Sequence, residues 1–71
     1  MSAVLDARGL SCPEPAMRAR RAMLEAGSGT LVLLLDSVAS RENVCRAAAH
    51  LGWQAAPESL PGDEFRVTLT R

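Results

Sequence analysis

Hydrophobic and polar positions along the chain predict four β-strands and two α-helices. A short apolar run at 3–5 and a nearly continuous one from Thr30 to Leu35 indicate two strands, the second with cover on at least part of both faces. Apolar and polar residues alternate over 53–58 and over 65–70, and the Pro61-Gly62 pair between these segments is typical of a tight turn. The last two strands should therefore form an antiparallel hairpin.

Apolar side chains recur with helical spacing in the two segments between these strands. The first predicted helix runs from Pro13 to Glu25, and the second runs to Leu51 from a cap at Ser37 or Ser40. Gly27 and Gly52 follow the two helices, as expected for residues that end a helix. The expected inward-facing residues are Ala16, Met17, Met23 and Leu24 in the first helix and Val44, Ala47, Ala48 and Leu51 in the second.

This order of elements, β-α-β-α-β-β, predicts an α/β two-layer sandwich. Right-handed crossovers would put both helices on one face of a four-stranded mixed sheet, with the first two strands parallel. The other face would be only half covered, so Leu33, Leu35 and Val67 are candidates for partial exposure and for a docking surface. With 71 residues, the chain is expected to form one domain, 1–71.

Composition and charge exclude several classes of function. Eight arginines, with no lysine, balance eight acidic residues, so there is no net positive field to attract nucleic acid or anionic lipid. No apolar run approaches the roughly 20 residues of a membrane span, and no signal peptide is recognisable, so we expect a cytoplasmic protein without membrane contact. A domain this small has no room for a deep cleft, and its function should lie on the surface.

Cys12 is the residue whose surroundings point most clearly to chemistry. It begins a Cys-Pro-Glu-Pro run at the predicted start of the first helix, where unpaired backbone N–H groups and the helix dipole favour a thiolate. If Cys12 is the N-cap, Pro13 and Pro15 occupy the first and third helical positions. The N–H groups of Glu14 and Ala16 would then lie near the sulfur. A cysteine that merely caps the helix is the simpler alternative.

The run Gly9-Leu10-Ser11-Cys12-Pro13-Glu14-Pro15, preceded by Leu5-Asp6-Ala7-Arg8, resembles the start of the TusA/SirA/YedF family of small bacterial sulfur-carrier proteins. The family signature is Cys-Pro-x-Pro after a strand and at a helix start. The resemblance spans nearly the whole chain, and the stretch from Asp36 to Arg46 is closer to YedF than to TusA. Further matching positions are Arg20-Arg21, Asp36, Glu42-Asn43-Val44 and Gly52.

The resemblance implies a function as well as a fold. It implies a sandwich like the C-terminal domain of a bacterial translation initiation factor, and a Cys12 that accepts sulfane sulfur as a persulfide. The donor would be a cysteine desulfurase or a rhodanese-like protein, and an acceptor protein would use the sulfur for tRNA thiolation, cofactor synthesis or sulfur oxidation. The YedF branch is linked to selenium metabolism. No cofactor and no metal are implied.

Residues around Cys12 are candidates for supporting roles. Gly9 permits a backbone conformation in the preceding loop that other residues resist, and Glu14 is either a favourable acidic residue in the first turn or a contact for a donor. The arginines are either solvated charges or contacts for an acidic partner, and the stem of Arg20 should lie along the sheet edge. The supporting candidates are Gly9, Pro13, Glu14 and Pro15, and the partner-binding candidates are Arg8, Arg20, Arg21 and Asp36.

Three other functions remain open beside the sulfur carrier. The fold could serve as a non-catalytic interaction or regulatory module, with Cys12 incidental. Cys12 and Cys45 could form a redox pair, although a cysteine at the margin of a helical stripe usually fills core space. Nucleic-acid binding by analogy with the initiation-factor fold is the weakest, since fold does not determine function. A zinc site is not expected, because His50 lies about 140° around the helix from Cys45, and Trp53 is expected to anchor the core.

Overall fold

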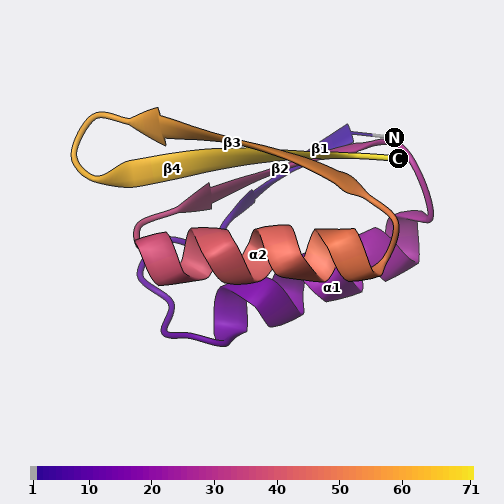
Figure 1. Cartoon of the computed structure of the whole chain (residues 1–71), viewed down its shortest axis with the longest axis horizontal. Helices are drawn as coiled ribbons and strands as arrows, with labels where there is room; N and C mark the ends of the chain where they lie inside the picture. The colour runs from indigo at the N-terminus through magenta and orange to yellow at the C-terminus, as the bar shows by residue number, and fades with distance from the viewer. Residues whose placement is uncertain (1) are drawn as a thin grey trace.

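Two helices pack against one face of a four-stranded sheet (Figure 1) in the computed structural model, which describes residues 2–71. This arrangement confirms the predicted element order and the predicted two layers. No helix in this part of the chain combines the length and apolar character needed to cross a membrane. The elements are β1 (Ser2–Asp6), α1 (Glu14–Ala26), β2 (Thr30–Leu35), α2 (Val38–His50), β3 (Gln54–Leu60) and β4 (Glu64–Thr70).

The strands are arranged in the order β1-β2-β4-β3. β1 and β2 are parallel, with Val4 opposite Val32, and β4 is antiparallel to both β2 and β3. The parallel pair and the β3–β4 hairpin are both as predicted. β1 is therefore an edge strand, and the loop from β1 to α1, which contains Cys12, begins at this edge of the sheet.

Alternation along the strands decides which side chains face the helices. Leu33, Leu35 and Val67 are each 0% exposed, so their predicted partial exposure is wrong. The odd-numbered residues of β2 point toward the helices, whereas Val32 and Leu34 lie on the open face and are half-buried. The continuous apolar run conceals this period of two, and the register with β1 and β4 fixes which set is inside. Full burial of one such leucine contributes about 1.5–3 kcal/mol.

The buried face of α1 differs from the predicted one. Its buried residues are Pro15, Ala19 and Met23, while Met17 is 59% and Leu24 is 56% exposed, so both were wrongly assigned to the inward stripe. α1 packs mainly against α2 and less against the sheet, so a narrow stripe at every fourth residue suffices.

α2 begins at Ser37, one of the two predicted caps. The Ser37 Oγ accepts a hydrogen bond from the Ser40 N–H at 3.0 Å, which satisfies one of the free donors of the first turn. Val44 and Ala48 are buried as predicted, and Ala47 and Leu51 are half-buried against the same core. Trp53 is buried in this core as well, which agrees with its predicted role as an anchor. The cap fixes where α2 starts and hence which of its residues lie beside Cys12.

Candidate functional site

Cys12 is exposed and lies immediately before α1. The N-cap of α1 is Pro13, so the predicted N-cap position of Cys12 is wrong by one residue. Pro15 consequently occupies the second helical position, and the Glu14 N–H donates to the carbonyl oxygen of Ser11 at 2.8 Å instead of facing the sulfur. The peptide bond between Cys12 and Pro13 is cis.

The polar groups that reach the sulfur come from α2. The side-chain amide Nδ2 of Asn43 donates to Cys12 Sγ at 3.1 Å, and Ser40 Oγ lies 4.0 Å from the same sulfur. Both residues lie on one face of α2, three positions apart. Sequence reasoning missed both roles, because Asn43 was only one of several family matches and Ser40 only an alternative cap. Contacts between two helices far apart in sequence leave no local pattern.

Both α2 side chains are themselves held by hydrogen bonds. Arg46 Nη1 donates to Asn43 Oδ1 at 2.8 Å. The Ser37 hydroxyl donates to Ser40 Oγ at 2.8 Å, which leaves the Ser40 hydroxyl hydrogen available to Cys12 Sγ. Ser40 is buried, whereas Cys12 and Arg46 are exposed. One side of the sulfur thus rests on oriented polar groups, and the other side is open to solvent.

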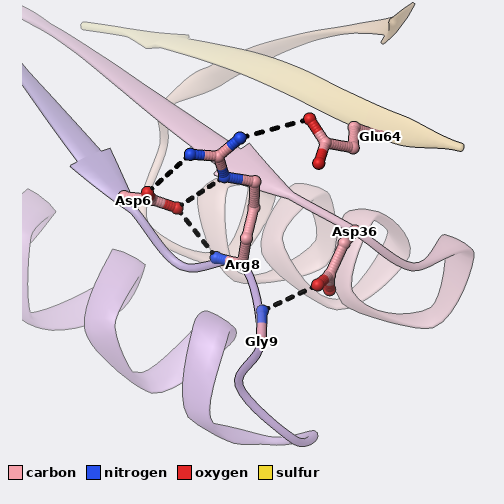
Figure 2. A network of polar contacts seen from close by, with 5 residues as sticks. All are labelled: Asp6, Arg8, Gly9, Asp36 and Glu64. Atoms are coloured by element: carbon pink, nitrogen blue, oxygen red, sulfur yellow. Dashed lines mark hydrogen bonds and ion pairs between the residues drawn. The ribbon is translucent and has the colours of Figure 1, made fainter. Parts of the chain in front are cut away.

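Asp36 anchors the loop that carries Cys12. Asp36 directly follows β2, and its carboxylate Oδ2 accepts a hydrogen bond from the Gly9 N–H at 2.7 Å (Figure 2). Gly9 has φ of 78°, a conformation that favours glycine. The hydrogen bond between Asp36 and Gly9 therefore fixes the loop. A direct role of Asp36 in partner binding stays a prediction.

Arg8 is held by two carboxylates within the chain (Figure 2). Its guanidinium bonds Asp6 at 2.8 Å and Glu64 of β4 at 3.3 Å, so it links the end of β1 to β4. The hydrogen bond from Arg8 lowers the pKa of Asp6 to about 2, and these carboxylates raise the pKa of Arg8. Arg8 is exposed, but its guanidinium is already paired, which leaves it less suited than an unpaired arginine to capture a partner.

Arg20 and Arg21 are exposed and line an open groove between α1 and the β1 edge. Glu14 lies in the same groove, where its carboxylate pairs with Arg18 Nε at 3.3 Å. Arg20 lines this groove together with Leu5 and Asp6 of β1, and the course of its stem along the sheet edge stays a prediction. The groove also takes in the exposed Met17 and Leu24, so it combines apolar and cationic surface.

Cys45 faces a different direction from Cys12. It is half-buried against the core, and burial raises the pKa of its thiol, which favours the unreactive protonated form. Cys45 lies two residues after Asn43, about 200° around α2, so it points away from the side that holds Cys12 Sγ. Within residues 2–71, no group of three His, Cys, Asp or Glu side chains is arranged to hold a metal ion. This geometry favours single-thiol chemistry at Cys12 over a Cys12–Cys45 redox pair.

Comparisons with known proteins agree with the fold and the family resemblance. A crystal structure of a SirA-like protein from Desulfitobacterium hafniense superposes with a TM-score of 0.91 at 32% sequence identity, over 99% of this chain and 96% of that chain. The family model described as sulfurtransferase TusA matches residues 3–71. This match includes β1 from Ala3 onward, the loop with Cys12, both helices and the terminal hairpin. The chain therefore belongs to the TusA sulfurtransferase family.

Proposed function

We propose that this protein is a sulfur-relay carrier, which accepts sulfane sulfur as a persulfide on Cys12 and passes it to an acceptor protein. The observation that carries the proposal is the exposed Cys12 Sγ, supported from one side by Asn43 of α2. Membership of a sulfurtransferase family supports it independently. A sulfur held from one side and open on the other can be approached by a second protein.

The chemistry of the relay is an exchange between sulfur atoms. The Cys12 thiolate attacks the outer sulfur of a donor persulfide, and a new S–S bond forms while the donor's S–S bond breaks. The donor cysteine leaves as a thiolate. Any proton on the outer sulfur stays on that sulfur and is transferred with it to Cys12. Electrons and atoms balance within the two proteins, so neither a cofactor nor an external oxidant is required.

The partners of this relay are proteins. We expect a cysteine desulfurase or a rhodanese-like protein as donor, and we expect the cytoplasm as the compartment. Arg20, Arg21 and Glu14 line the groove beside α1 and are suited to contact a charged partner surface. Direct binding of nucleic acid is not part of the proposal, because the chain has no net charge. Use of the sulfur for tRNA thiolation, or selenium as cargo, stays a prediction from the family resemblance.

Loading by a donor protein tests the proposal. The protein is incubated with a cysteine desulfurase and cysteine, and its intact mass is then measured. We expect a gain of one sulfur atom in the wild type and in Cys45→Ser, and no gain in Cys12→Ser. Absence of the gain in the wild type would favour the non-catalytic interaction module, and a gain that survives in Cys12→Ser would move the carrier role to another residue.

A further inference from the structure

We propose that Asn43, oriented by Arg46, stabilises the Cys12 thiolate as the leaving group when the carrier hands its sulfur on. This inference rests on the proposed carrier function and assigns a separate role to each of two α2 residues. Asn43 contacts the reacting sulfur directly, whereas Arg46 acts through Asn43 and is a positioning residue.

The orientation of the Asn43 amide is set by its two neighbours. An asparagine amide has one accepting end and one donating end, and a guanidinium can only donate. Because Arg46 Nη1 donates to Oδ1 at 2.8 Å, the Nδ2 end must face away from Arg46. That end lies 3.1 Å from Cys12 Sγ, so the sulfur is offered a donor and not an acceptor.

A donor at this position favours one state of the sulfur over the other. When the outer sulfur is transferred, Sγ leaves as a thiolate with a full charge, and hydrogen bonds to charged groups are stronger than those to neutral ones. In the loaded carrier, Sγ is the inner sulfur of a persulfide and is nearly neutral, so the same contact is weaker. Asn43 therefore stabilises Cys12 more after the sulfur has left than before.

The stronger stabilisation of the thiolate speeds the step in which the loaded carrier passes its outer sulfur to an acceptor. An acceptor nucleophile attacks the outer sulfur, a bond to the acceptor forms, the S–S bond to Cys12 breaks, and its electron pair returns to Sγ. Thiolates that are better stabilised leave faster. The attack comes from the solvent side, where Cys12 is exposed, while Asn43 and Ser40 lie on the α2 side of the sulfur.

Cyanide tests the step without any partner protein. The full chain in a Cys45→Ser background is loaded with inorganic polysulfide, freed of excess, and treated with cyanide, which attacks the outer sulfur and releases thiocyanate and the Cys12 thiolate. We expect thiocyanate release to be about 3- to 10-fold slower in Asn43→Asp and Asn43→Ala than in the wild type. Asn43→Asp keeps the side-chain shape but replaces the donor by a charged acceptor, so it should be the slower of the two.

Arg46→Gln tests the positioning role. Without the guanidinium the Asn43 amide can turn, so we expect a slower release than in the wild type but a faster one than in Asn43→Ala. Arg71→Gln is the matched control, since Arg71 lies beside Gly29 at the start of β2, whereas Cys12 lies near the end of β2. Arg46→Lys keeps a donor for Asn43 Oδ1, so it should release thiocyanate faster than Arg46→Gln, a rescue that a purely structural role of Arg46 would not produce.

Two outcomes would overturn the inference. One is wild-type release in both Asn43 variants, and the other is an equal slowing in Arg71→Gln. Failure of the proposed function is seen separately, because a wild type that takes sulfur from polysulfide but not from any desulfurase or rhodanese-like protein would contradict the relay while leaving the Asn43 comparison valid.

Discussion

The carboxylate of Asp36 accepts a hydrogen bond from the backbone N–H of Gly9 at 2.7 Å, so the end of β2 fixes the loop that carries Cys12 (Figure 2). The two residues are 27 positions apart, and their contact joins the central strand to a segment with no regular secondary structure. Two residues, Leu10 and Ser11, separate Gly9 from Cys12, and α1 begins soon after, at Glu14. The position of the sulfur over α2 therefore depends on this anchor as well as on Asn43.

Replacing Gly9 by alanine should disturb the loop through its backbone alone. No atom lies within 4 Å of an added Cβ, but φ of 78° is costly for alanine. We expect a loss of about 1 kcal/mol in the free energy of unfolding and a severalfold slower persulfide loading. Gly62→Ala is the matched control, because Gly62 also has φ of 78° and open space but lies in the β3–β4 turn. Urea unfolding should give both variants the same loss, and only Gly9→Ala should load slowly.

Asp36→Ala removes the acceptor of the same hydrogen bond. The Gly9 N–H is exposed and can bond water, so we expect a modest loss of about 1 kcal/mol in the free energy of unfolding. Loading of Cys12 should slow more than stability suggests, since the loop loses its tie to β2. Asp63→Asn, at another exposed turn, serves as a control for charge, since asparagine tolerates the positive φ of 57° at this position. Equal loading rates in Asp36→Ala and the wild type would contradict the anchoring role.

The fold could be predicted because its signals are local. Apolar runs, the Pro61-Gly62 turn and the glycines after each helix define the elements, and handedness rules define the layers. The faces were harder to predict. In β2, apolar residues occupy both faces, so only pairing with β4 reveals that Leu33 is inside and Leu34 is not. In α1, packing against α2 turns the helix so that Ala19 is buried and Met17 is exposed.

The site was predictable only in part, for the same reason. Cys12 is recognisable from its prolines, but the side chains that contact its sulfur come from α2. The nearer of them in sequence, Ser40, lies 28 residues after Cys12. Because the N-cap is Pro13, the Glu14 N–H donates to the Ser11 carbonyl and not to the sulfur, as it could if Cys12 were the cap. Predicting the role of Asn43 required knowing how α1 and α2 pack.

Two methionines of α1 test the rotation of this helix. Met23 is 1% exposed in the core, whereas Met17 is 59% exposed. Met23→Ala should lower the free energy of unfolding by about 2–5 kcal/mol through loss of burial and a cavity, and Met17→Ala should change it by no more than about 0.5 kcal/mol. Thermal or urea unfolding of the two variants measures the difference. Similar losses would place α1 in the orientation that its sequence pattern predicts.

Stability should depend on pH through Asp6. Its pKa is about 2 in the folded protein against 3.8 for the free side chain, because Arg8 donates hydrogen bonds to it. A carboxylate with a depressed folded pKa stabilises the fold above its unfolded pKa and loses this contribution as pH falls through the folded pKa. The loss should lie between pH 3.8 and about 2. Asp6→Asn should flatten the stability profile in this window, as measured by urea unfolding at a series of pH values, while Asp63→Asn should not.

The arginines of the α1 groove should govern the encounter with a donor protein. Arg20 and Arg21 are exposed beside the apolar Met17 and Leu24, and exposed charges at the edge of an interface mainly affect association rates. We expect Arg20→Glu and Arg21→Glu to slow loading by a cysteine desulfurase by roughly 10-fold at low salt, with a smaller effect at high salt. Loading by inorganic polysulfide should be unchanged, because no docking is involved. Arg71→Glu makes the same change of charge at a residue that does not line the groove, so an equal effect there would assign the slowing to net charge and not to the groove.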